Sequence, residues 1–128
     1  MNFKKERLEK IIKEAAEQSG RGVIPVLNET LDFKKALEKE SVKSANKNDL
    51  NIIFDSTGKP LFKLSTCEVN NLKKLARIGI FVGPEGGWTE KELALAKSKN
   101  FKIISLGKLT LRAETAAIIA SYLAVNLK

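Results

Sequence analysis

The spacing of apolar and polar residues changes along this chain of 128 residues. Residues 3–18 place apolar side chains at intervals of three and four, the spacing that predicts one face of a helix. Residues 50–54, 80–82 and 101–106 are short apolar runs, which are typical of strands buried on both faces of a parallel sheet. A helical pattern follows the second run, at 89–99. Strands that alternate with helices predict an α/β fold, with a mostly parallel sheet and helices on both faces.

Shorter sequence patterns predict the structure of three other segments. Residues 23–27 contain a proline and predict a short strand at a sheet edge or strand end. Thr30 or Asp32 is predicted to cap a second helix that runs to about Glu40. Residues 55–60 are dense in turn-forming residues and predict a loop. No internal repeat or linker is visible, so one domain is expected.

A glycine-rich turn follows the strand that ends at Val82. It reads Gly83-Pro84-Glu85-Gly86-Gly87, and Thr89 with Glu92 then predicts a capping box at a helix start. The glycines permit positive φ and a close approach of a ligand to the backbone. Open α/β sheets bind their ligands at such strand–turn–helix junctions, although a capped turn without a ligand has the same pattern.

The type of ligand is restricted by this turn. It matches neither the dinucleotide-binding nor the P-loop glycine pattern. Glu85 also carries a negative charge, which would oppose a phosphate group at the start of a helix. A neutral or cationic ligand with hydroxyl groups to hold is therefore favoured.

A second turn, Ser105-Leu106-Gly107-Lys108-Leu109, leaves the last predicted strand and again runs into a helix. Two such turns at neighbouring strand ends predict one pocket at the carboxyl edge of the sheet. Arg112 and Glu114 lie beside this turn, at the start of the last helix. They are candidate site residues, and an exposed ion pair at a capped helix is the alternative.

The last predicted helix, at about 113–127, is apolar on almost every side. It is shorter than the roughly 20 apolar residues that cross a bilayer, so no membrane span is predicted. A helix that is apolar all round is expected to be buried all round. One side should cover the sheet and the other should contact a partner, for which a homodimer is the simplest arrangement.

The net charge favours one class of partner, and the numbers of cysteine and histidine residues exclude several kinds of site. The net charge of +8 favours binding to a polyanion such as nucleic acid. The aromatic content of only 6% disfavours a binding mode in which aromatic side chains stack on single-stranded bases. Cys67 is the only cysteine and there is no histidine, which excludes a disulfide framework, a Cys/His zinc site and a His-dependent triad. No metal is predicted, and a lone thiol without an apolar leader predicts a cytoplasmic protein.

These motifs together resemble those of a known family. The two turns and Leu111-Arg112-Ala113-Glu114-Thr115-Ala116 look like three motifs of the ribosomal RNA small-subunit uridine-N3 methyltransferases, within the SPOUT class of knotted methyltransferases. Residues 7–11 and 14–21 are similar to the motif that opens that family's catalytic domain. The match covers essentially the whole chain, with the motifs in the same order.

The resemblance implies a fold, a cofactor and partners. The fold would be a single SPOUT domain over residues 1–128 with a C-terminal trefoil knot, assembled as a homodimer through the knot helices. The family's N-terminal RNA-binding β-barrel domain would be absent. The cofactor would be S-adenosylmethionine, which has no phosphate and carries a sulfonium cation. The partner would be small-subunit ribosomal RNA or the assembled small subunit.

By the same resemblance, the expected cofactor-binding residues are those of the three motifs: Val82, Gly83, Pro84, Glu85, Gly86, Gly87, Ser105, Leu106, Gly107, Leu109, Leu111, Arg112 and Thr115.

The implied reaction moves the methyl group of the cofactor to N3 of a uridine, which must lose its proton. Without histidine, the proton can go to a carboxylate or to water, or arginine can stabilise the uridine anion. The catalytic candidates are Arg21 and Arg112 for the anion or the RNA, and Glu114, with Glu85, as base or structural acceptor.

Three alternatives remain open at this point. A SPOUT methyltransferase acting on a ribose 2′-hydroxyl or on transfer RNA would keep the two turns. A non-catalytic basic RNA-binding module would keep the charge without binding a cofactor. A nucleotide-binding protein is disfavoured by Glu85 and by the absence of a P-loop lysine.

Overall fold

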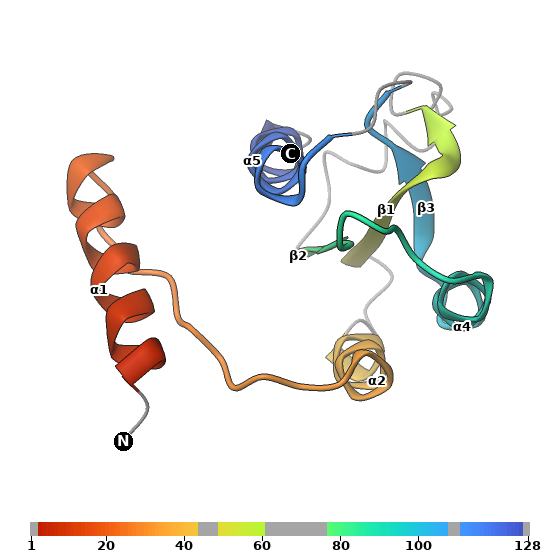
Figure 1. Ribbon diagram of the computed structural model, residues 1–128, viewed down its shortest axis with the longest axis horizontal. Helices are drawn as coiled ribbons and strands as arrows, with labels where there is room; N and C mark the ends of the chain where they lie inside the picture. Colours follow the sequence, from red (N-terminus) through yellow and green to blue (C-terminus); the bar gives the residue numbers. More distant parts are fainter. Residues whose placement is uncertain (1–2, 44–48, 61–76, 108–110, 127–128) are drawn as a thin grey trace. The chain divides into compact units, whose positions relative to one another are not determined.

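The computed structural model describes four parts of the chain, residues 3–43, 49–60, 77–107 and 111–126 (Figure 1). The chain forms two compact units, Met1–Leu31 and Asp32–Lys128. In the described parts, no helix is long and apolar enough to cross a membrane.

The first unit begins with helix α1 (Phe3–Gln18), where the apolar spacing predicted a helix. Gly20 takes the left-handed conformation at φ 68° directly after it. Its amide donates to the carbonyl of Glu17 at 3.2 Å, and the amide of Arg21 donates to that of Ala16 at 3.0 Å. These two bonds are those of a Schellman motif, so a glycine terminates the helix.

The strand predicted at 23–27 is wrong. The segment is irregular, and its two valines are 77% and 81% exposed. The described residues of the first unit contain no strand, so within this unit the segment has no neighbouring strand with which its backbone could form hydrogen bonds. Glu29, two residues past this segment, forms an ion pair with α1: Lys5 Nζ lies 2.7 Å from Glu29 Oε1, and the hydrogen bond in this pair lowers the pKa of the Glu29 carboxyl.

In its described residues, the second unit contains three strands and three helices: α2 (Phe33–Lys43), β1 (Asp49–Pro60), β2 (Arg77–Val82), α4 (Glu90–Ser98), β3 (Lys102–Ser105) and α5 (Ala113–Asn126). The strands and helices predicted for this part of the chain are confirmed, with ends that differ by a few residues, except that β1 runs six residues past its predicted end at Phe54. Asp32 rather than Thr30 caps α2, because its Oδ1 accepts a hydrogen bond from the amide of Lys35 at 3.0 Å.

All three strands are parallel and lie in the order β2-β1-β3. The central strand pairs with both neighbours, and Ile53 lies opposite Phe81 of β2 and Ile103 of β3. The predicted parallel sheet is therefore confirmed. Because the strands run in one direction, their carboxyl ends share one edge of the sheet.

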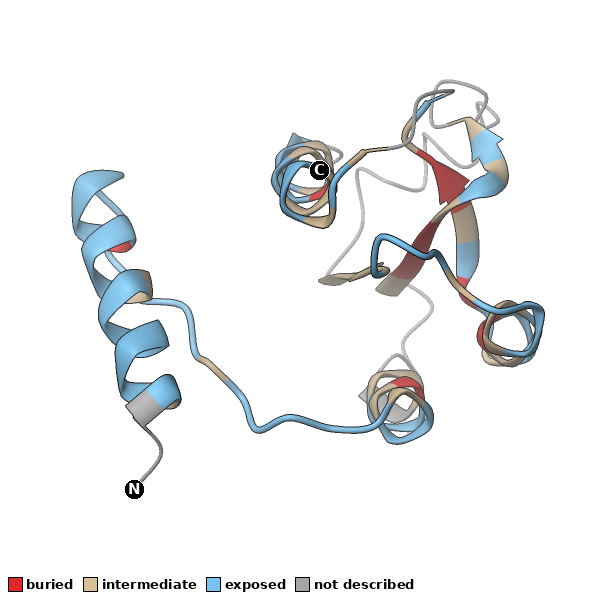
Figure 2. Ribbon diagram, viewed as in Figure 1, coloured by how far each residue is buried: buried red, intermediate tan, exposed pale blue. Residues whose placement is uncertain are grey.

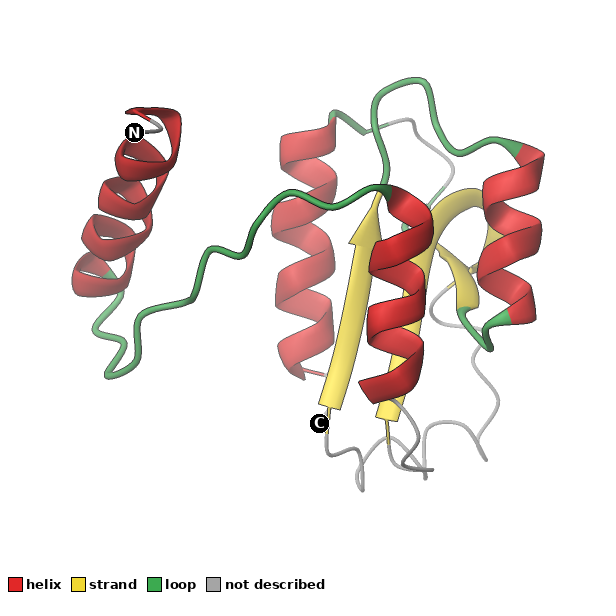
Figure 3. Ribbon diagram, turned by 90° about the horizontal axis from the view of Figure 1, so that it is seen from below, coloured by secondary structure: helices red, strands yellow, loops and turns green. Residues whose placement is uncertain are grey.

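Helices cover both faces of this sheet, as predicted (Figures 1 and 3). On one face, Leu37 of α2 and Ala96 of α4 pack with Ile53. On the other face, Ala120 of α5 packs with Ile52. Figure 2 shows that the buried residues of this unit are concentrated on the strands. The central strand thus contributes to two separate hydrophobic cores.

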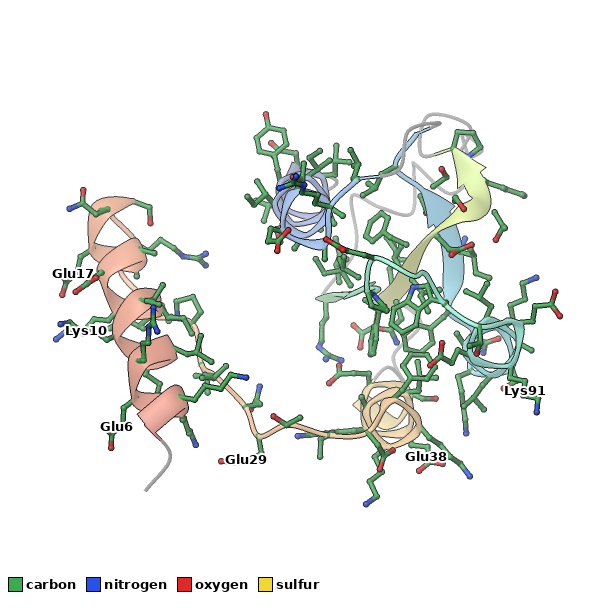
Figure 4. All side chains as sticks on the ribbon, viewed as in Figure 1. Glu6, Lys10, Glu17, Glu29, Glu38 and Lys91 are labelled. Atoms are coloured by element: carbon green, nitrogen blue, oxygen red, sulfur yellow. The ribbon has the colours of Figure 1, made fainter. Side chains whose placement is uncertain are left out.

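The outer sides of the helices differ. Glu38 on α2 and Lys91 on α4 point away from the sheet and are exposed (Figure 4). On α5 the exposed positions include Ile118, Tyr122 and Val125, which are 71%, 68% and 73% exposed. Their spacing of four and three places them on one side of the helix. The helix that was predicted to be apolar all round therefore packs one side on the sheet and leaves an apolar side exposed.

The loop predicted at 55–60 is wrong, because β1 continues to Pro60 after an irregularity. The register to β3 shifts between Phe54 and Lys59, and both residues pair with Ile104. Gly58 explains why the strand can continue, since a Cβ there would lie 2.6 Å from the backbone nitrogen of Ile104. The turn-forming residues build a bulge against the neighbouring strand rather than a loop.

Candidate functional site

The glycine turn after β2 has the conformation that its sequence favours. The amide of Gly87 donates to the carbonyl of Pro84 at 2.9 Å, which closes a β-turn, and Gly87 has φ 75°. The predicted capping box of α4 is confirmed. The amide of Glu92 donates to Thr89 Oγ1 at 3.2 Å, and the amide of Thr89 donates to Glu92 Oε2 at 2.8 Å. These bonds fix the turn between β2 and α4.

The turn after β3 is built around Ser105, a buried polar residue. Its hydroxyl donates to the carbonyl of Gly107 at 3.0 Å and accepts from the amide of the same residue at 3.2 Å. Gly107 has φ 142°, a conformation that favours glycine. The side chain of Ser105 therefore shapes the backbone of this turn.

The two turns enclose a cavity of about 270 Å³ at the carboxyl edge of the sheet. Residues 54–56 of β1 and the start of α5 complete its wall. Its residues are Phe54, Asp55, Ser56, Val82, Gly83, Pro84, Glu85, Gly86, Gly87, Trp88, Ser105, Leu106, Gly107, Leu111, Ala113 and Ala116.

Most of the predicted cofactor residues are brought together here. Those that line the cavity are Val82, Gly83, Pro84, Glu85, Gly86, Gly87, Ser105, Leu106, Gly107 and Leu111.

The other predicted site residues lie elsewhere. Arg112, Glu114 and Thr115 are exposed at the start of α5 and do not line the cavity, although the residues next to Arg112 do. Leu109 lies outside the described residues. Arg21 belongs to the first unit and is exposed there.

Sequence reasoning missed Trp88 and residues 54–56 of β1. The indole Nε1 of Trp88 donates to the carbonyl of Phe54 at 3.0 Å, which connects the glycine turn to the central strand. The Trp88 ring also packs on Phe33 of α2, with 4.8 Å between ring centroids. Two signals were available: a tryptophan directly after a glycine turn, and Asp55-Ser56 directly after an apolar run.

The glycines of the site have two different surroundings. A Cβ on Gly83 would lie 2.9 Å from Cε2 and Nε1 of Trp88, so this glycine leaves room for the indole. A Cβ on Gly86, Gly87 or Gly107 would meet no atom within 4 Å. The first glycine is therefore required by packing, while the other three present their backbone to open space.

The electrostatic character of the cavity is negative. Asp55 and Glu85 line it, and the described lining residues include no lysine or arginine. Apolar side chains such as Val82, Leu106 and Leu111 form much of the remaining wall. The cavity therefore suits a ligand with an apolar ring and a positive charge, and it disfavours a phosphate.

Comparison with known proteins gives consistent matches. Residues 1–125 match the family described as an RNA methyltransferase domain. The chain is 38% identical to "ribosomal RNA small subunit methyltransferase E" of Synechocystis sp. over 117 residues, which cover 91% of this chain and 37% of that protein. The protein of the same name from Rickettsia conorii is 38% identical over 116 residues, covering 90% and 44%.

Solved structures agree with these matches. A putative methyltransferase from Legionella pneumophila, in complex with the bound cofactor SAM, is 29% identical with a TM-score of 0.75, over 94% of this chain and 45% of that one. Ribosomal RNA small subunit methyltransferase E from Neisseria gonorrhoeae, bound to S-adenosyl methionine, is 30% identical with a TM-score of 0.72, over 93% and 46%. The chain spans less than half the length of these relatives.

The packing of Trp88 on Gly83 can be tested with Gly83→Ala. The new Cβ displaces the indole and weakens its bond to Phe54, so we expect a loss of about 1 to 2 kcal/mol in the free energy of unfolding. Urea denaturation followed by circular dichroism measures this loss. Gly86→Ala is the matched control and should not be destabilising, because its Cβ meets no atom within 4 Å. Equal stability of the two variants would contradict the assigned role of Gly83.

Proposed function

This chain belongs to the family of RNA methyltransferase domains, and we propose that it binds S-adenosylmethionine and methylates N3 of a uridine in small-subunit ribosomal RNA. The observation that carries the proposal is the cavity that both glycine turns form at the carboxyl edge of the sheet. The relatives named for small-subunit ribosomal RNA, and two solved structures with bound SAM, support the substrate and the cofactor.

The residues of the cavity fit this cofactor. Backbone at Gly86, Gly87 and Gly107 faces open space, so a ligand can approach it closely. Val82 and Leu111 offer apolar contacts for an adenine ring, while the two carboxylates suit a sulfonium cation. When bound, the cofactor supplies the methyl group that the uridine nitrogen accepts. These residues of the chain would hold it, and they would exclude water from its apolar part.

Arg112 and Glu114 are the proposed residues for the acceptor side of the reaction. Arg112 directly precedes α5, its carbonyl accepts from the amide of Ala116 at 2.8 Å, and its neighbours Leu111 and Ala113 line the cavity. Its exposed guanidinium would stabilise the negative charge that develops when N3 loses its proton. Glu114, or Glu85 in the cavity wall, would accept that proton or a hydrogen bond.

The basic charge of the chain supports RNA as the partner. The lysine and arginine side chains that give the chain its net charge of +8 would contact the phosphate groups of RNA. Arg21 of the first unit is proposed to position the RNA. Lys73 and Lys74 are further candidates for phosphate contacts, and they lie outside the described residues. A substrate of this kind would place the protein in the cytoplasm.

The knot and the dimer complete the proposal. The three motifs that resemble the SPOUT class support a trefoil knot at the C-terminal end of the domain. The apolar side of α5, formed by Ile118, Tyr122 and Val125, supports a homodimer that covers it.

The cofactor site is tested by Gly86→Val. The valine side chain would occupy the space where the ligand approaches the turn, so we expect the affinity for S-adenosylmethionine to fall at least 100-fold in calorimetry. The fold should persist, because no atom lies within 4 Å of the added Cβ and φ is ordinary there. Gly22→Val is the matched control, since Gly22 has equally open surroundings but lies in the first unit. Unchanged affinity in Gly86→Val would remove the turn from the site.

The reaction is tested by mapping methylated nucleosides. We expect 3-methyluridine after incubation of the chain and S-adenosylmethionine with unmodified small ribosomal subunits at low salt, which strengthens phosphate contacts. Mass spectrometry of the digested RNA identifies the product. A 2′-O-methyl nucleoside would instead support another RNA target. Cofactor binding with no methylated product on small subunits or transfer RNA would support a non-catalytic RNA-binding module.

The dimer is tested by Tyr122→Glu. A charge on the exposed apolar side of α5 should prevent association without unfolding the monomer, because Tyr122 is 68% exposed. Light scattering at micromolar concentration should give a dimer for the original chain and a monomer for the variant. Ala94→Glu adds the same charge on the exposed surface of α4 and should leave the dimer intact. A monomeric original chain would refute the proposal.

A further inference from the structure

A carboxylate lies where the regular part of the middle strand ends, between the two turns. The strand order β2-β1-β3 places this point of β1, at Phe54 and Asp55, between the turn that follows β2 and the turn that follows β3. Asp55 directly follows Phe54, where the regular register ends, and it lines the cavity. A ligand that contacts both turns would therefore lie near Asp55.

The carboxylate of Asp55 is held in place by its own bulge. Its Oδ2 accepts hydrogen bonds from the amide of Thr57, at 3.0 Å, and from the hydroxyl of Thr57. No partner for Oδ1 is found in the described residues, and the side chain is half-buried. One oxygen thus fixes the orientation, and the other remains available to a ligand. Such preorganisation lowers the entropic cost of binding.

The charge of this cavity contrasts with the charge of the chain. Asp55 and Glu85 are both acidic residues, and no described lining residue carries a positive charge to neutralise them. The chain as a whole carries +8. Of the two carboxylates, that of Asp55 is the less exposed, so solvent screens it less. Its charge should therefore have the greater effect on a bound ligand.

We infer that Asp55 makes the site selective for the charge of the cofactor, so that it binds cationic S-adenosylmethionine more tightly than the neutral thioether S-adenosylhomocysteine. The inference rests on the proposed function. In methyl transfer the bond between the methyl carbon and sulfur breaks, the acceptor nitrogen forms the new bond, and sulfur keeps the electron pair. Sulfur loses its positive charge in this step.

The position of Asp55 determines which part of the cofactor it affects. The sulfur lies between the adenosyl and the aminoacyl parts of the cofactor, so it is the group expected near the middle strand when the two parts contact the two turns. The attraction to Asp55 is then present before transfer and lost after it. Product would dissociate more readily than the cofactor, which makes Asp55 a specificity-determining residue for the methyl-donor site.

Calorimetric titration of the full chain with each compound tests this inference. The original chain should bind S-adenosylmethionine more tightly than S-adenosylhomocysteine. In Asp55→Asn we expect the affinity for S-adenosylmethionine to fall about tenfold, or about 1.4 kcal/mol, and that for S-adenosylhomocysteine to change less than twofold. Asp49→Asn is the matched control, because it removes the same charge at the opposite end of β1, away from the cavity. It should change neither affinity.

The possible outcomes separate the two proposals. If the original chain binds neither compound, the proposed function fails. If it binds both, and Asp55→Asn weakens both equally or neither, the role of Asp55 is refuted while the proposed function stands. Should Asp55→Asn not fold, the salt dependence of the original chain decides instead. Affinity for S-adenosylmethionine should decrease from 50 mM to 500 mM salt more steeply than that for S-adenosylhomocysteine, and equal slopes would overturn the inference.

Discussion

The burial of β1 on both faces is the constraint on which the second unit depends. Ile53 faces α2 and α4, while Ile52 faces α5, and both side chains are fully buried. Each such side chain contributes roughly 1.5 to 3 kcal/mol by its removal from water. A strand buried in this way must have strands on both sides and helices above and below. The end of its regular part, at Phe54, then lies between the turns of its two neighbours, so the position of the cavity follows from the core.

The hydrogen bond from Trp88 connects this core to the site. The indole packs on Phe33 within one core and donates to the carbonyl of Phe54 at the cavity wall. Gly83 leaves the space that the indole occupies. The glycine turn is therefore held by three groups: the β-turn bond, the capping box of α4 and the indole. A backbone fixed in this way needs little rearrangement to receive a ligand.

Local signals were sufficient for some features and insufficient for others. The apolar runs, the capping box and the two glycine turns depend on residues close in sequence, and the structure contains each of them. The bulge at 55–60 was missed because it depends on contact between Gly58 and the backbone of β3. A strand was wrongly predicted at 23–27 because a short apolar run cannot show whether a pairing strand exists. Asp55 was missed as a site residue because its place between the two turns depends on the strand order.

The indole at the cavity wall has a spectroscopic consequence. The chain contains one tryptophan, so its ultraviolet-excited emission above about 320 nm comes essentially from Trp88. The ring lines the cavity and its Nε1 is hydrogen-bonded to Phe54, so its surroundings would change directly when a ligand displaces water from the site. The wavelength and intensity of that emission would report occupancy of the cavity without any added label, and stopped-flow mixing would then resolve the rates at which ligands enter and leave.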